Sequence, residues 1–124
     1  MLSMGLFALA AFLHIGFFVM ESLLWNKPAV RRIFRTTVEE AQTTKFLAFN
    51  QGFYNLFLAM GILAGLWLEP YNNSYGVILL LFSSTCMILA SLVLATGGKH
   101  RWRGALIQGL PPLLALMSYF HKVH

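Results

Sequence analysis

Four long apolar stretches alternate with short polar segments along the chain. They cover residues 2–24, 46–68, 76–95 and 104–120. Because a helix needs about 20 largely apolar residues to cross about 30 Å of hydrocarbon, this pattern predicts an all-α fold, an integral membrane four-helix bundle that forms one domain over residues 1–124. The first stretch has no basic start and no early break. We therefore expect it to be a retained span rather than a cleaved signal peptide.

Basic residues gather on one side of the predicted bundle. Five lie in the loop 25–45 and three in the loop 96–103, so these two loops hold eight of the nine basic residues. The opposite turn at 69–75 holds none. Because basic loops of membrane proteins stay in the cytoplasm, we expect both loops to be cytoplasmic and both termini to be outside.

Local signals mark the ends of the predicted helices. Thr37 and Glu40 have the spacing of a capping box, which predicts that the second long helix starts near Val38. Pro70 lacks the N–H that would continue this helix, so the helix is expected to end just before it. The two glycines at 97–98 are expected to end the third helix.

The segment 26–35 combines apolar side chains at helical spacing with three arginines on the opposite side. This pattern is typical of a short helix lying on the inner leaflet. A basic loop that only fixes the topology would have the same composition. The sequence leaves both interpretations open.

The first apolar stretch carries His14 and Glu21, with Trp25 following on the same stripe. In a regular α-helix, positions seven residues apart lie within about 20° of one face and about 10.5 Å apart along the axis. His14 and Glu21 therefore cannot bond each other directly. Ionisable groups at membrane depth are candidates for function, although Glu21 could instead form a salt bridge with Arg101 or Arg103.

The second stretch has a polar face in its inner half and two glycines further out. Gly61 and Gly65 form a GxxxG pair, which permits close helix packing within the chain or a homodimer contact. We favour the contact within the chain. The polar face spans an arc of about 140° and consists of Asn50, Gln51, Tyr54 and Asn55.

The fourth stretch contains Gln108 shortly before Pro111 and Pro112. Each proline frees a backbone carbonyl four residues earlier, and freed groups in a membrane must find other partners. A kink that only fits the bundle is the simpler interpretation. By depth, Glu21, the amides of the second stretch and Gln108 all lie in the inner half, which predicts that they converge on one polar pocket. Interhelical hydrogen bonds between the amides are the structural alternative.

Composition restricts the classes of function. Apolar residues make up 58% of the chain and charged residues only 10%, which excludes an ordinary soluble domain. The single Cys86 cannot form an internal disulfide. The net charge of +5 is explained by membrane orientation, so no nucleic-acid partner is expected. The sequence has neither an HExxH motif nor a phosphate loop, and we expect no metal and no cofactor.

Three segments resemble a known family. They are His14 to Glu21 with Trp25, the segment Asn50-Gln-Gly-Phe-Tyr-Asn55, and Gln108-Gly-Leu-Pro111. Together they are similar to a bacterial family of small four-helix membrane proteins known only as domain of unknown function 1304. The resemblance implies the four-helix fold, a multi-pass protein of the bacterial inner membrane, and the importance of these residues; it implies no activity. A looser chemical similarity to sterol-isomerase-type membrane proteins is an analogy only.

Three functions fit these patterns. The first is a protein that binds or converts a small amphiphile, with His14 and Glu21 as acid and base and with Trp25, Asn50, Gln51, Tyr54, Asn55 and Gln108 as ligand-binding residues. The second is a small oligomeric transporter or proton-coupled carrier. The third is a purely structural or partner-binding membrane protein. Membrane lipids are the partners expected in every case.

Overall fold

The computed structural model describes residues 1–123, and nearly all of them are helical. This confirms the all-α prediction. The elements, in chain order, are α1 (Leu2–Phe18), the π-helix η1 (Val19–Leu23), α2 (Pro28–Phe34), α3 (Val38–Leu68), α4 (Asn73–Ala95), the 3-10 helix η2 (Lys99–Arg101) and α5 (Trp102–Val123).

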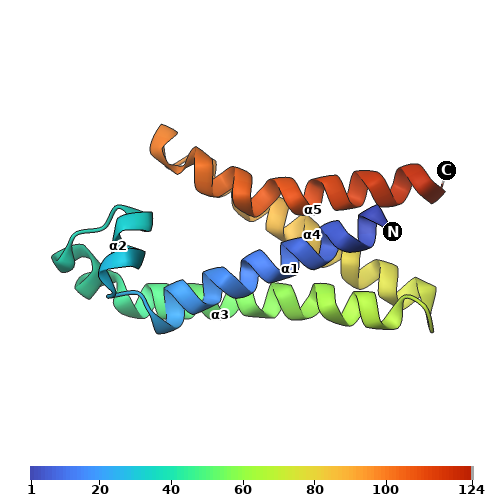
Figure 1. Ribbon diagram of the computed structural model, residues 1–124, viewed down its shortest axis with the longest axis horizontal. Helices are drawn as coiled ribbons and strands as arrows, with labels where there is room; N and C mark the ends of the chain where they lie inside the picture. The colour runs from blue at the N-terminus through green and yellow to red at the C-terminus, as the bar shows by residue number, and fades with distance from the viewer. Residues whose placement is uncertain (124) are drawn as a thin grey trace.

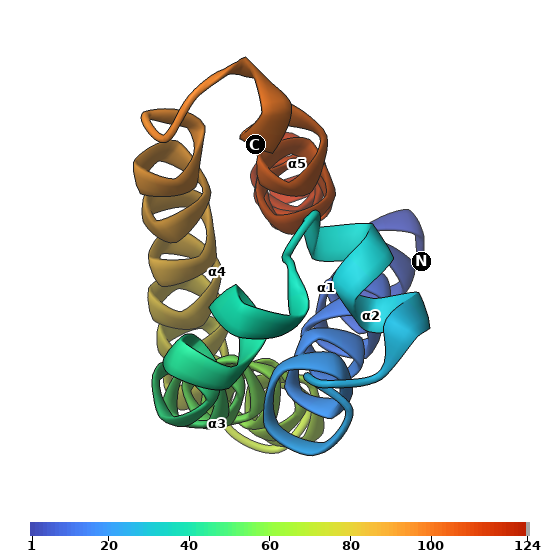
Figure 2. The ribbon, with the colours of Figure 1, turned by 90° about the vertical axis from the view of Figure 1, so that its left-hand side faces the viewer.

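The four long helices pack in a closed ring, in which α1 contacts α3 and α5, and α4 contacts the same two helices. Figure 1 shows α1 running along α3, with α4 crossing obliquely behind and α5 on the far side of α1. Figure 2 shows that α4 leads away from α3 toward the loop before α5. The end of α3 that carries α2 is therefore covered less than its other end.

Within residues 1–123, three helical segments are long and apolar enough to cross a membrane: Leu2–Leu23, Val38–Leu68 and Asn73–Ala95. The fourth expected span stays a prediction. Residues 104–120 do lie within a helix, α5, but this helix is not among the three apolar spans. Gln108 and two internal prolines make it less apolar than the others. Figure 1 shows α5 changing direction part-way along its length, as expected for a helix with internal prolines.

The predicted helix boundaries agree with the structure. Thr37 caps α3 in a complete capping box: its Oγ1 accepts a hydrogen bond from the Glu40 N–H at 3.1 Å, and its own N–H donates to Glu40 Oε2 at 3.3 Å. The helix starts at Val38 and ends at Leu68, two residues before Pro70. The segment 26–35 contains the helix α2, with Val30 buried, which favours the helical interpretation of this segment.

Glycine–serine contacts hold the long helices close together. A Cβ added to Gly61 of α3 would overlap Ser83 of α4, and one added to Gly109 of α5 would overlap Ser91 of α4. At Gly65, an added Cβ would lie 2.8 Å from Leu80 Cγ. The GxxxG pair thus contacts α4 of the same chain, which is the arrangement that we favoured. Small residues at a helix–helix contact let the two backbones approach closely. Such close packing stabilises helix pairs in a membrane, where the hydrophobic effect does not drive helices together.

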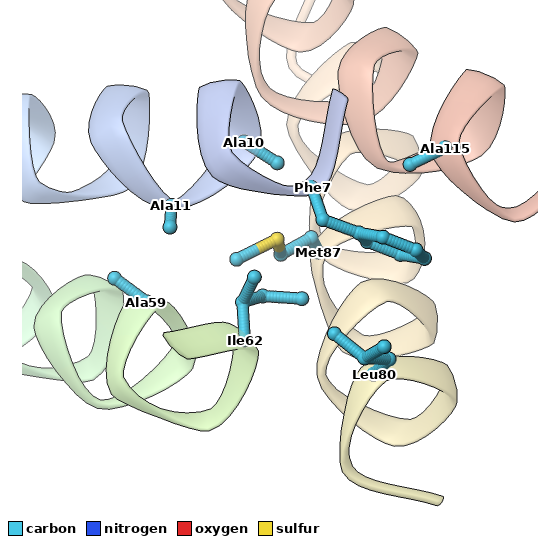
Figure 3. Close-up of a cluster of buried hydrophobic side chains, with 8 residues drawn as sticks. All are labelled: Phe7, Ala10, Ala11, Ala59, Ile62, Leu80, Met87 and Ala115. Carbon is cyan, nitrogen blue, oxygen red and sulfur yellow. The ribbon is translucent and has the colours of Figure 1, made fainter. Parts of the chain in front are cut away.

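The apolar core fills the half of the bundle that contains the chain termini. Figure 3 shows its side chains meeting from all four long helices. They are Phe7, Ala10, Ala11, Ala59, Ile62, Leu80, Met87 and Ala115. Glu21, Trp25 and the amides of α3 are not part of this cluster.

Candidate functional site

Glu21 lies in the π-helix η1, a feature that the sequence did not predict. The N–H of Leu24 donates to the carbonyl of Val19 at 3.0 Å, which is the i to i+5 bonding that defines a π turn. Such single turns are rare and frequently occur at functional sites. A π-helix has more residues per turn than an α-helix. The α-helical spacing that would place His14 and Glu21 on one face therefore holds only as far as Phe18, where α1 ends.

The Glu21 carboxylate is bound by Asn55. Asn55 Nδ2 donates to Glu21 Oε1 at 2.6 Å, and the Asn55 side chain is only 3% exposed. This bond joins η1 to the middle of α3. The alternative in which Glu21 pairs with Arg101 or Arg103 is wrong for this structure, because both arginines are exposed and line a different pocket.

A glycine brings η1 close enough to α3 for this bond. A Cβ added to Gly52 would overlap Ser22 Oγ and would lie 2.9 Å from the Ser22 backbone nitrogen. Ser22 Oγ donates to the Phe49 carbonyl at 2.7 Å, so η1 is tied to α3 next to Glu21. The contact between η1 and α3 therefore contains two hydrogen bonds, Ser22 to Phe49 and Asn55 to Glu21, and a close backbone approach at Gly52.

Glu21 also lines an open groove of about 680 Å³ between η1, the following turn and the first turns of α3. We call it the Glu21 groove. Trp25 lines it too; its Nε1 donates to Thr44 Oγ1 at 3.3 Å, and its ring lies 5.0 Å from that of Phe34. The groove is also lined by Lys27, Lys45, Phe46 and Phe49. The groove thus combines one carboxylate and two ammonium groups with aromatic surface.

His14 lies inside the bundle and does not line the groove. It is fully buried; its Nδ1 donates to the Ala10 carbonyl at 2.9 Å, and its ring packs edge-on against Phe17 with the centroids 5.3 Å apart. Among residues 1–123, Nε2 has no hydrogen-bond partner. These contacts are those of an internal residue held within its own helix.

The remaining predicted site residues do not line the Glu21 groove. Gln108 is buried in α5, beside the contact between Gly109 and α4. Three residues of α3 are exposed and are not part of the groove: Asn50, Gln51 and Tyr54. The structure thus brings together Glu21, Trp25 and Asn55 out of the eight predicted residues.

Several groove residues were absent from the sequence prediction. Lys27 and Lys45 were considered only as topology signals, and Phe46 and Phe49 only as apolar residues of a span. A signal was available, because Phe46, Phe49 and Phe53 share a helical face directly after Lys45. Aromatic and basic side chains at a predicted interface indicate an amphiphilic surface.

A family model described as "Protein of unknown function (DUF1304)" matches residues 8–120. The chain belongs to this family. The match includes η1, the Glu21 groove and the four long helices, so the DUF1304 domain is essentially the whole described structure. Neither the search of curated proteins nor that of solved structures found a match.

Proposed function

We propose that this DUF1304 protein is an integral membrane protein that binds or converts a small amphiphilic molecule in the Glu21 groove. The observation that carries the proposal is the position of Glu21 between a buried partner and an open surface. Asn55 fixes one carboxylate oxygen, while the side chain still lines the groove. A positioned carboxylate of this kind accepts a hydrogen bond from a ligand or takes part in proton transfer.

The shape and chemistry of the groove support this class of ligand. Its volume of about 680 Å³ falls within the range of ordinary small-molecule sites. Lys27 and Lys45 supply donors for a polar end, and Trp25 adds aromatic surface beside them. Phe46 is 77% exposed and Phe49 44% exposed, so they offer aromatic surface to an apolar tail. A polar end near Glu21 and a tail along α3 would use both parts.

The residues take different roles in this proposal. Glu21 is the proton-transfer candidate, and Trp25 and Asn55 position the ligand and the carboxylate. His14, which the sequence suggested as the second proton-transfer group, donates one hydrogen bond to its own helix and does not line the groove. Asn50 and Gln51 of α3 are outside the groove. Of the two acid–base candidates from the sequence, only Glu21 therefore lines the groove.

The same proposal places the protein in a bacterial cytoplasmic membrane, with its basic loops on the cytoplasmic side. With the basic loops in the cytoplasm, the groove opens at the inner leaflet of a bacterial cytoplasmic membrane. A ligand would then enter from lipid and not from the external medium. The three apolar helices and the basic end of the molecule support this orientation.

Mass spectrometry of co-purifying small molecules tests the function. The wild type should carry an amphiphile that is lost from Glu21→Gln, because the amide still accepts the Asn55 bond but has no charge and no proton to exchange. Glu69→Gln is the matched control, since Glu69 also accepts a hydrogen bond from an asparagine, Asn73, at 3.0 Å. That variant should retain the molecule. Equal recovery of the same molecules from all three proteins would contradict the proposal.

A further inference from the structure

A second pocket lies where the end of α2, the end of α4, η2 and the start of α5 meet. Its volume is about 380 Å³. Figure 2 faces this end of the molecule, with the loop between α4 and α5 at the top of the view and α2 below it. We call it the basic pocket, after the five basic side chains that line it: Arg35, Lys99, His100, Arg101 and Arg103.

The charged side chains that line the basic pocket are all basic. None of its lining residues is an aspartate or a glutamate. Its five basic residues are all exposed, so their long side chains are free to move toward a ligand. Four permanent cations around one pocket repel one another, and an anion placed between them removes this repulsion.

The backbone directs these side chains from two separate loops. Arg35 ends α2 in the left-handed conformation, with φ of 54°, which is uncommon for a residue with a side chain. Across the pocket, Arg101 folds back over a glycine: a Cβ added to Gly97 would lie 2.5 Å from Arg101 Cδ. Gly98 has a φ of 121°, which turns the chain into η2. Both segments thus have a backbone residue with positive φ at or near the arginines that line the pocket.

The rest of the lining is apolar. Phe34 and Leu94 are half-buried, whereas Ile33 and Ile107 are 64% and 42% exposed. Leu94 lies at the end of a candidate membrane span, so the pocket is at the level where lipid headgroups meet hydrocarbon. A free inorganic anion would use the arginines but not this apolar surface. A headgroup with attached acyl chains would use both.

We propose that the basic pocket binds the phosphate headgroup of an anionic membrane lipid. Arginine binds phosphate through two parallel N–H donors, and three arginines line this site, one each from the end of α2, η2 and the start of α5. Basic pockets between transmembrane helices are suited to such headgroups. The site shares no lining residue with the Glu21 groove, so it stands or falls independently of the proposed function.

Native mass spectrometry of the full-length chain in a non-ionic detergent tests this site. Phosphatidylglycerol and phosphatidylcholine are titrated separately against the wild type, Arg101→Gln and Arg103→Gln. We expect phosphatidylglycerol to bind more tightly than phosphatidylcholine, and each variant to weaken phosphatidylglycerol binding about fivefold. Arg32→Gln is the matched control, because Arg32 is exposed on α2 but does not line the pocket. It should bind within twofold of the wild type.

Three results would overturn the proposal. Equal binding of the two lipids would show that the pocket does not select for an anionic headgroup. An equal loss in Arg32→Gln would indicate diffuse attraction to the whole basic end. Displacement of the lipid by an equal concentration of inorganic phosphate would assign a free-anion site instead. If either variant does not fold, Arg35→Gln replaces it, since Arg35 lines the pocket from the other loop.

Discussion

Replacing Gly52 with alanine is expected to separate η1 from α3. The added Cβ would overlap Ser22 Oγ and would lie 2.9 Å from the Ser22 nitrogen and 3.0 Å from its Cβ. Rotation of the serine side chain relieves only the first of these contacts. The nitrogen belongs to the backbone of η1, so the π-helix itself must shift.

The cost follows from three contributions. Overpacking at a close contact costs about 1–3 kcal/mol. Moving Ser22 also breaks its hydrogen bond to the Phe49 carbonyl, which is a net loss of about 0.5–1.5 kcal/mol. Alanine returns about 0.5–1 kcal/mol through its higher helix propensity. We therefore expect Gly52→Ala to lower the free energy of unfolding by about 0.5–4 kcal/mol.

Unfolding by titration with sodium dodecyl sulfate measures this change. Gly16→Ala is the control, because an added Cβ at Gly16 has nothing within 4 Å; it should be neutral or stabilising by up to about 1 kcal/mol. In Gly52→Ala/Ser22→Ala, the overlap with Oγ is gone but the backbone contact is not, so we expect partial recovery. The reasoning is refuted if Gly52→Ala is as stable as Gly16→Ala.

Two further predictions concern the site and the topology. Asn55→Leu leaves the half-buried Glu21 carboxylate without its hydrogen-bond donor and should destabilise the protein by about 1–3 kcal/mol. Glu21→Gln keeps an acceptor for Asn55 and should cost less. Unfolding in detergent compares the two variants, and equal destabilisation would argue against the bond between Asn55 and Glu21. In a Cys86→Ser chain, an impermeant thiol reagent applied to intact cells should label a cysteine at Asn73 and not one at Arg32; the reverse pattern would overturn the topology.

The sequence predicted those parts of the fold that depend on local interactions. The start of α3 follows from Thr37 and Glu40, which bond each other within one turn, and its end follows from Pro70. The close contact of Gly61 and Gly65 with another helix was likewise readable from their spacing. The conversion of residues 19–23 to a π-helix was not readable, because it depends on how Ser22 and Glu21 bond to α3.

The candidate site could be predicted only in part, for a similar reason. Glu21 and Asn55 were identified as costly polar groups inside a membrane, and they do bond each other. Whether Gln51 and Tyr54 join them depends on the crossing of α3 and α4, which neither helix encodes alone. The aromatic wall at Phe46 and Phe49 was hidden because aromatic residues are ordinary in an apolar span.

Fluorescence of Trp25 tests the central claim most directly, because this residue lines the Glu21 groove. In a chain with Trp67→Phe and Trp102→Phe, Trp25 is the only tryptophan, and a brominated long-chain alcohol in detergent micelles serves as the quenching ligand. We predict saturable quenching that Glu21→Gln weakens, because a charged acceptor binds a hydroxyl about twice as strongly as a neutral one. A reference chain that retains only Trp67, at the other end of α3, should show quenching that rises without saturation. Parallel, unsaturated quenching of both tryptophans would contradict the existence of a ligand site at Glu21.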